Sequence, residues 1–393
     1  MNTILDISIQ NHKKALIRVD FNVPIVDGVI KNNFRILQSL DTIKYCIENG
    51  LAVILMSHLG RPKNSKRDES LSLRPVANEL SKLLNKDVKF SNCCIQDDSI
   101  STSEKLNPTE IHLLENLRFH DGEKDNDENF ARKLSKHANI YINDAFGTTH
   151  RAHASNVGIV KFMEACYIGF LNIKELKYLS ENLKSPIKPY SFLMGGVKVS
   201  DKIQLIENIL NSADLICIGG AMAFTFIKAK GLNIGNSYFE ESAIDLAGSI
   251  IYKAKQKEVE LVLPLDVVVS EHIDKTKDVC IKDIDSLSAK DCGFDIGPKT
   301  SSLFEGKLKK SKTIVWNGPL GVAEKKIFSN GTNSIARFLN NLRDVSTVIG
   351  GGDTASCVYN VLPENNFSHI STGGGSSLEL LSGNKLPAFE VLK

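Results

Sequence analysis

Short apolar runs alternate with stretches of helical periodicity along the whole chain, and this alternation limits the fold more than any other feature. Residues 34–49, for example, carry apolar side chains three and four positions apart, and Gly50 follows as a stop signal. The strand-like runs are residues 15–19, 51–56, 111–114, 140–142, 190–194, 215–218, 261–263, 314–316, 347–349 and 369–371. Such alternation predicts mostly parallel sheets that are covered by helices on both faces.

The length of 393 residues fits two domains, at roughly 150 residues per domain. A helix-like stretch follows Gly169, and Pro186 and Pro189 break it before the next strand-like run. We therefore expect a first domain over residues 1–168, a helical linker over 169–189 and a second domain over 190–379.

Glycine-rich turns follow five of the strand-like runs in the second half. They are residues 195–196, 219–220, 317–319, 350–353 and 372–375. One such turn is usually just a tight connection, but parallel strands bring all five to one edge of a sheet, where ligands bind. Glycine lets the backbone approach a ligand, and helix N-termini offer N–H groups to anions. The second half is therefore interpreted as the domain that binds nucleotide phosphates.

Charged residues stand beside these turns, and each has a plainer alternative. Lys198 and Lys202 either face a phosphate or are solvated lysines. A lysine in a first helical turn opposes the helix dipole, which a bound phosphate would explain. Asp353 is either an N-cap or a ligand of Mg²⁺. Glu324 either accepts hydrogen bonds from a ribose or faces water.

Cations follow the strand-like runs of the first half. Arg35 begins the first helical stretch, and Arg61, Arg118 and Arg151 lie on loops after later runs. Any one of them alone is most simply a surface arginine. Because all four occupy matching topological positions, we expect them to converge on a phosphate or carboxylate pocket.

Composition and motifs exclude several classes of protein. Lys and Arg total 48 against 46 Asp and Glu, a balance that argues against a general nucleic-acid binder. The eight cysteines form no C-x-x-C pair, and neither a signal peptide nor a run of ~20 apolar residues is present. We therefore expect a cytoplasmic protein without a membrane partner. The P-loop and dinucleotide-binding fingerprints are also missing.

Taken together, these motifs make the chain closely similar to the phosphoglycerate kinase family along almost its whole length. The matching segments are 18–24 (RVDFNVP), 57–62 (SHLGRP), 114–119 (LENLRF), 144–147 (DAFG), 150–153 (HRAH), 198–202 (KVSDK), 295–299 (DIGPK), 316–319 (WNGP), 350–354 (GGGDT) and 372–375 (TGGG).

The resemblance implies a fold of two Rossmann-like α/β/α domains with parallel sheets, joined by a helical hinge across a deep interdomain cleft. It implies that residues 380–393 return to the first domain, and that the protein is a monomer. It also implies reversible, Mg²⁺-dependent transfer from 1,3-bisphosphoglycerate to ADP, giving 3-phosphoglycerate and ATP by in-line transfer after domain closure. Two alternatives remain open: a dinucleotide-dependent dehydrogenase, and a non-catalytic nucleotide-binding or scaffold protein of the same fold.

The resemblance also assigns site residues by their positions in this sequence. The residues implied to hold the triose acid are Asp20, Phe21, Asn22, Arg35, His58, Leu59, Gly60, Arg61, Arg118 and Arg151. Those implied to hold the nucleotide are Lys202, Gly293, Glu324, Gly351, Gly352, Asp353 and Thr354, with Asp353 at the metal. Those implied to act on the moving phosphoryl group are Arg35, Lys198, Gly373, Gly374 and Gly375.

Overall fold

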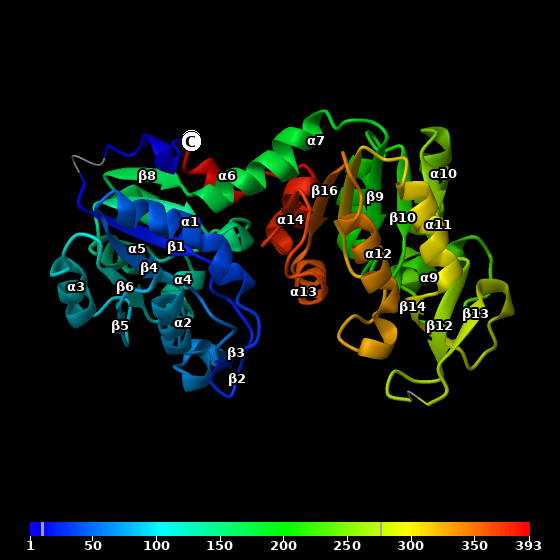
Figure 1. Cartoon of the computed structure of the whole chain (residues 1–393), viewed down its shortest axis with the longest axis horizontal. Helices are drawn as coiled ribbons and strands as arrows, with labels where there is room; N and C mark the ends of the chain where they lie inside the picture. Colours follow the sequence, from blue (N-terminus) through cyan, green and yellow to red (C-terminus); the bar gives the residue numbers. More distant parts are fainter. Residues whose placement is uncertain (9–11, 276) are drawn as a thin grey trace. The chain divides into compact units, whose positions relative to one another are not determined.

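The computed structural model describes residues 1–8, 12–275 and 277–393 (Figure 1). The chain divides into two compact units. Unit 1 comprises Met1–Lys177 together with Lys385–Lys393, and unit 2 comprises Tyr178–Asn384. Each unit is built around its own parallel sheet, and each is described by itself.

The sheet of unit 1 has six parallel strands. Their order is β5 (Val88–Ser91), β6 (Ile111–Leu114), β4 (Ala52–Met56), β1 (Lys14–Val19), β7 (Ile140–Asp144) and β8 (Ala165–Ile168). Strand β1 lies near the middle and pairs with β4 on one side and with β7 on the other. The loops that leave β1 and both of its neighbours therefore share one edge.

The two faces of this sheet differ in character. Ile17 and Val19 of β1 belong to a large apolar core, together with residues of α1 (Phe34–Glu48) and α2 (Arg74–Leu84), and α6 (Phe170–Leu176) packs against it. Because side chains alternate along a strand, Arg18 points to the opposite face, where it is fully buried. The remaining helices are α3 (Asp97–Glu104), α4 (Asp121–Lys124) and α5 (Glu128–Ser135), and a small hairpin joins β2 (Ile25–Val26) to β3 (Val29–Ile30).

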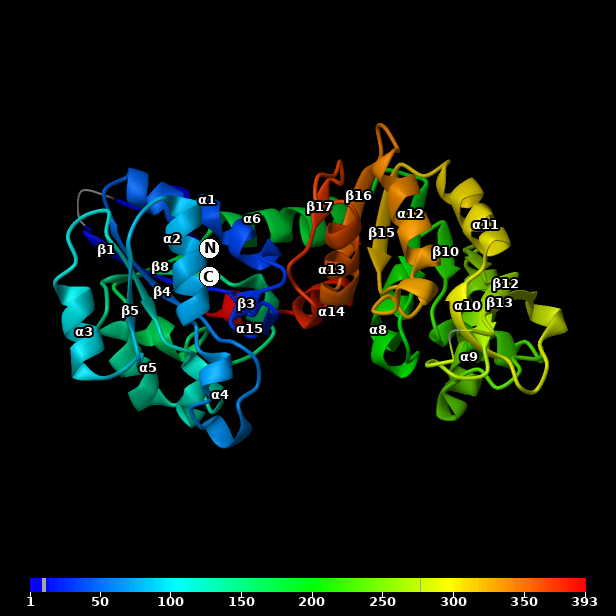
Figure 2. The same cartoon turned by 60° about the horizontal axis from the view of Figure 1, so that its bottom comes forward.

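Unit 2 contains a second parallel sheet of six strands and a smaller antiparallel sheet. The parallel order is β11 (Glu260–Val262), β10 (Leu215–Ile218), β9 (Tyr190–Met194), β15 (Thr313–Asn317), β16 (Ser346–Gly350) and β17 (His369–Ile370). The antiparallel order is β13 (Cys280–Asp283), β12 (Asp266–Ser270) and β14 (Cys292–Ile296). The main helices are α8 (Ile203–Ile209), α9 (Met222–Ala229), α10 (Ile244–Gln256), α11 (Pro298–Leu308), α12 (Asn330–Asn340), α13 (Gly352–Val361) and α14 (Gly375–Leu381), all labelled in Figure 2.

The two parallel sheets confirm the predicted fold class, but sequence analysis missed several strands. Edge strands β5 and β8 were not predicted, nor was the antiparallel sheet. Strand β5 (VKFS) is half-buried and carries Lys89 and Ser91, so it lacks the continuous apolar run that marks a buried parallel strand, whereas β8 (ACYI) is apolar but only four residues long. Strand β13 is similarly half exposed.

The segment that connects the units is helical. Helix α6 runs into a single π-helical turn at Lys177–Glu181 and then into α7 (Asn182–Lys184). The division between the units falls between Lys177 and Tyr178, inside this segment, whereas the sequence placed the domain ends at residues 168 and 190.

The segment Lys385–Lys393 packs on unit 1, although unit 2 precedes it in the chain. It contains α15 (Pro387–Glu390), and the Phe389 ring stacks on Phe146 with ring centres 6.4 Å apart. The backbone N–H of Ala388 donates to the carbonyl of Thr149 at 3.1 Å. The sequence placed the start of the returning segment at residue 380, but Leu381 ends α14 within unit 2.

No helix in the described part of the chain has the length and apolar character needed to cross a membrane.

Phe389 should contribute measurably to the stability of unit 1, because its side chain is 4% exposed. We expect Phe389→Ala to lower the free energy of unfolding by about 3 kcal/mol through lost burial and an unfilled cavity. Urea unfolding followed by circular dichroism measures this change. Val391→Ala is the matched control in the same segment, since Val391 is 37% exposed. An equal effect of both variants would show that the segment is not anchored by Phe389.

Candidate functional site

Polar and charged side chains gather where the central strands of unit 1 end. Asp20 follows β1, His58 follows β4, Arg118 follows β6, and Arg151 lies on the loop after β7. Parallel pairing brings these strand ends to one edge of the sheet. Arg118 and Arg151 therefore converge as the sequence predicted, and we call them, together with Arg18, Arg35 and Arg61, the basic cluster.

Asp20 and Asn22 organise one side of the basic cluster. The Arg35 guanidinium donates from Nη1 to Asp20 Oδ2 at 3.0 Å and to the Asn22 carbonyl at 3.3 Å. The Asn22 side-chain oxygen accepts the backbone N–H of Gly60 at 2.8 Å, so the loops after β1 and β4 are tied together. These contacts hold the Arg35 guanidinium at the strand ends.

Arg118 is buried, and one of its side-chain donors has no hydrogen-bond acceptor among the described residues. Its side chain is 4% exposed, and Nη1 donates to the Gly60 carbonyl at 2.5 Å. Its Nε is buried and has no hydrogen-bond partner among the described residues. Burial, Arg151 and Arg18 together lower the pKa of Arg118 to about 10, against the smaller opposing effects of Glu123 and Asp20. A buried guanidinium with an unused donor and cationic neighbours indicates a place for an anion.

Arg151 shows the same crowding. Burial lowers the pKa of Arg151, and nearby Arg61 adds to the effect. The basic cluster therefore concentrates positive charge that Asp20 and the buried Glu123 only partly neutralise. Such an arrangement suits a ligand with several negative charges.

Two of the predicted acid-site residues contribute through their backbone. The side chains of Phe21 and Leu59 lie in the apolar core. The Phe21 N–H donates to Ser57 Oγ at 2.8 Å, and the Leu59 N–H donates to Asn116 Oδ1 at 3.1 Å. These residues fix the shape of the loops, and their side chains are turned away from the basic cluster.

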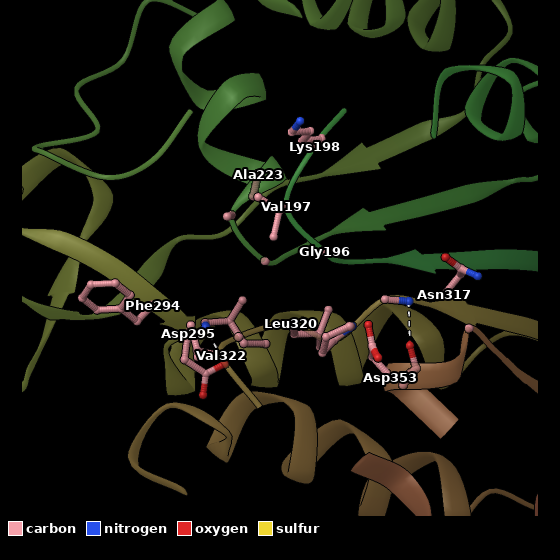
Figure 3. Close-up of a pocket in the computed structure, with 18 of the residues that line it drawn as sticks. Gly196, Val197, Lys198, Ala223, Phe294, Asp295, Asn317, Leu320, Val322 and Asp353 are labelled. Carbon is pink, nitrogen blue, oxygen red and sulfur yellow. Dashed lines mark hydrogen bonds between the residues drawn. The ribbon is translucent and has the colours of Figure 1, made fainter. Parts of the chain in front are cut away.

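Unit 2 contains a pocket of about 670 Å³ at the carboxyl edge of its parallel sheet (Figure 3). Its lining includes nearly all residues that the resemblance assigned to the nucleotide and to transfer: Lys198, Lys202, Gly293, Glu324, Gly351, Gly352, Asp353, Thr354, Gly374 and Gly375. Gly373 directly precedes the last two.

The glycine turns shape this pocket, because the backbone of one turn lies in direct contact with the backbone of the next. A Cβ atom on Gly195 would lie 2.0 Å from the carbonyl oxygen of Pro319. Gly318 has a φ of 98°, which other residues rarely adopt, and its N–H donates to Thr354 Oγ1 at 2.8 Å. The turns after β9, β15 and β16 thus form one continuous wall of backbone.

Lys202 is half-buried and places its amine beside this wall. Its Nζ donates to Asn317 Oδ1. Burial, against the smaller opposing effects of Asp201 and Asp353, lowers the pKa of Lys202 to about 8. An amine held at reduced pKa with few protein partners is suited to a phosphate oxygen. Lys198 is exposed on the loop after β9.

The pocket also contains a carboxylate that could bind a divalent cation. Asp353 is exposed and lies in the first turn of α13, beside the glycine turn. The described residues contain no group of three or more His, Cys, Asp or Glu side chains able to enclose a metal. Mg²⁺ does not require such a group, because it is usually held by one or two carboxylates together with phosphate oxygens and water. The residues therefore fit a metal that enters with a phosphorylated ligand.

Several residues of both sites were not assigned from sequence. Asn317 holds Lys202, and Asp295 lines the pocket with a carboxylate whose pKa burial raises to about 7. Both lie in family motifs, residues 295–299 and 316–319, so the sequence contained a signal for each. Glu123, buried behind the basic cluster, gave no signal, because its charged neighbours at residues 121–125 resemble a solvated surface.

The chain is similar to members of one known protein family along almost its whole length. Residues 4–384 match the family model described as phosphoglycerate kinase. A phosphoglycerate kinase of Finegoldia magna is 48% identical over 99% of this chain and 98% of its own length, and one of Dictyoglomus turgidum is 46% identical over 100% and 98%. Among solved structures, phosphoglycerate kinase from Coxiella burnetii is similar with a TM-score of 0.83 at 37% identity, covering 99% of this chain and 98% of its own. The enzyme from Pyrococcus horikoshii is similar with a TM-score of 0.85 at 30% identity, covering 100% and 98%.

The unused donor of Arg118 leads to a prediction about anion binding. We expect Arg118→Met to weaken inorganic phosphate binding at least ~10-fold, the cost of losing one charge-assisted contact. Without phosphate the variant should unfold at the same or a higher temperature, because a buried like-charge contact is removed. Thermal unfolding at increasing phosphate concentration measures both quantities. Arg132→Met is the control, since Arg132 is 58% exposed and pairs with Glu128. Unchanged phosphate stabilisation in Arg118→Met would contradict the anion site.

Proposed function

The chain belongs to the phosphoglycerate kinase family and is a kinase enzyme, and we propose that it transfers a phosphoryl group reversibly between 1,3-bisphosphoglycerate and ADP, giving 3-phosphoglycerate and ATP. The observation that carries the proposal is Arg118, buried among other cations with an unused donor. The glycine-walled pocket of unit 2 supplies the second ligand site that a transfer reaction needs.

Under this proposal the basic cluster holds the triose acid. Arg61, Arg118 and Arg151 present forked donors to its phosphate and carboxylate oxygens. His58 and Asn22 contribute on the other side, and Asp20 holds Arg35 ready for the reacting group. Phe21, Leu59 and Gly60 shape the loops that carry these donors.

The unit 2 pocket holds the nucleotide under the same proposal. Lys202 and the turn Gly351–Thr354 face its phosphates, while Gly293 and Glu324 lie at the part that takes the nucleoside. Gly293 is required for close packing, because a Cβ there would lie 2.1 Å from the Phe224 ring. Asp353 would hold Mg²⁺ together with the phosphates.

Phosphoryl transfer requires positioning and charge stabilisation more than covalent chemistry. Bound with the nucleotide, Mg²⁺ offsets negative charge on the phosphate oxygens. Arg35 and Lys198 stabilise the charge on the moving group, and the Gly373–Gly375 turn at the start of α14 offers backbone N–H groups. A phosphoryl group passes directly only between ligands in contact, so the reaction requires the two units to bring their ligands together and exclude water.

We propose further that the enzyme works in the cytoplasm as a monomer. The eight cysteines are all free, which suits a reducing compartment. Neither a nucleic acid nor a membrane is part of the proposed reaction, which agrees with the near balance of 48 basic and 46 acidic residues.

A direct assay tests the proposed reaction. Purified protein is supplied with 1,3-bisphosphoglycerate, ADP and Mg²⁺, and ATP formation is followed by a coupled assay. We expect turnover that depends on all three components. Absence of ATP above a control without enzyme would support a non-catalytic binding protein instead, and NAD-dependent absorbance change would support a dehydrogenase.

Lys198 provides the sharpest test of the transfer step. We expect Lys198→Ala to lower kcat by roughly 10²-fold, the usual cost of losing one group that stabilises developing charge. The fold should be unaffected, because Lys198 is exposed. Lys310→Ala is the control, since Lys310 is exposed and is not among the residues that line this pocket. Near-normal turnover of Lys198→Ala would remove Lys198 from the mechanism.

Lys202 should make ADP affinity depend on pH. The amine is charged below its pKa of about 8 and neutral above it, so it attracts phosphate less as pH rises through this value. We expect the Kd for ADP to rise roughly tenfold between pH 7.5 and 9.5, as the charged fraction falls. Isothermal titration calorimetry with ADP and Mg²⁺ measures the change, and Lys202→Met should bind weakly with little pH dependence over this range. The same pH dependence in Lys202→Met would assign it to another group.

A further inference from the structure

A buried charged network lies directly behind the basic cluster. Arg18 and Glu123 both have side chains that are 0% exposed, with Arg18 Nη2 4.0 Å from Glu123 Oε1. Burial alone would raise the pKa of Glu123, but His153, Arg18 and Ser155 outweigh it, so the pKa is lowered and the carboxylate stays charged. A buried ion pair contributes little net stability by itself, so we looked for the groups that this pair holds in position.

Ser155 connects the two charges with a definite direction of hydrogen bonding. Its hydroxyl donates to Glu123 Oε1 at 2.7 Å and accepts from Arg18 Nε at 2.8 Å. The Ser155 backbone N–H also donates to Glu123 Oε2 at 3.0 Å. The remaining Arg18 nitrogens are directed by this arrangement, and Nη1 donates to the carbonyl of Val19. The Arg18 guanidinium is thus held on three sides.

The fourth contact of Arg18 reaches His58. Arg18 Nη2 lies 3.2 Å from His58 Nδ1. A guanidinium has only donors, so Nδ1 must accept and cannot carry a proton. The ring proton of His58 is therefore on Nε2, and the imidazole is neutral.

The surroundings of His58 favour the same state. Asp20 Oδ1 lies 3.8 Å from Nδ1 and would favour a charged imidazole; among the described residues it is the carboxylate that pairs with this ring. Against it, burial and the nearby guanidinium groups of Arg18, Arg118, Arg35 and Arg151 together lower the pKa of His58 well below 6.5. Cations therefore face His58 from β1, α1, η5 (Leu117–Phe119) and the loop after β7.

We propose that Glu123 is a positioning residue that acts through Ser155 and Arg18 to hold His58 in its neutral form with the proton on Nε2, ready to donate one hydrogen bond to the acid ligand. Its use by a ligand rests on the proposed function of the basic cluster. A fixed tautomer gives a single donor of defined direction. The alternative is an ion pair that stabilises the fold without directing His58.

Imidazole nitrogen NMR of the whole protein, labelled with ¹⁵N-histidine, tests the tautomer without any ligand. His58 is assigned from the signal lost in His58→Gln. We expect Nδ1 to show the shift of an unprotonated nitrogen and Nε2 that of a protonated one, unchanged from pH 8 to pH 5. In Glu123→Gln the two shifts should move toward each other as the tautomers mix. A protonated Nδ1 in the wild type, or an unchanged spectrum in Glu123→Gln, would overturn the proposal.

A double-mutant cycle tests whether the effect passes through His58. We expect Glu123→Gln to raise the KM for 3-phosphoglycerate roughly tenfold, the loss of one directed hydrogen bond, while kcat and the KM for ATP change less than twofold. In the His58→Gln background the same change should add little. Additive effects would mean that Glu123 only stabilises the fold.

Two further variants keep the test decisive. Ser155→Ala removes the connecting hydroxyl while leaving both charges, and it should reproduce the His58 spectrum of Glu123→Gln if the latter folds poorly. Glu128→Gln is the control, because Glu128 is 61% exposed and pairs with Arg132 on the surface. Absence of kinase activity in the wild type would remove the proposed function but leave the NMR result to stand on its own.

Discussion

The parallel pairing of the central strands is the constraint on which both sites depend. Strand β1 runs parallel to β4 and β7, and β9 runs parallel to β10 and β15. The loops after these strands therefore lie at the same edge of each sheet. This places residues that are far apart in the sequence close together in space. In unit 1 the loops carry cations, and in unit 2 they carry glycines. The chemistry of each unit follows from what its sequence places after each strand.

Both sites are kept in a state that is unfavourable without a ligand. In unit 1, guanidinium groups lower one another's pKa, and Arg118 has an unused donor. In unit 2, Lys202 is charged at neutral pH although burial opposes it. The packing around each site holds the guanidinium groups and the Lys202 amine in these unfavourable positions. The cost falls on the stability of the folded protein and is offset when an anion binds.

How much was predictable from sequence can be judged residue by residue. Arg118 and Lys202 were found because they stand beside strand ends and inside recognisable motifs. The central strands were found because each is a continuous apolar run, whereas β5 and β13 are half exposed and gave no such run. Glu123 could not be found, because its neighbours are charged and its burial arises only when the loop containing Ser155 folds over it. Properties that depend on burial, such as the lowered pKa of Lys202, likewise exist only in the folded chain.

The segment Lys385–Lys393 has a consequence for how the protein is made. The ribosome synthesises the chain from the N-terminus, so residues 1–177 emerge first. All of unit 2 is made before the segment Lys385–Lys393, which contacts Phe146. Unit 1 therefore keeps part of its apolar interior exposed until the ribosome has finished synthesising unit 2. Co-translational folding of this chain cannot finish in the order in which it begins.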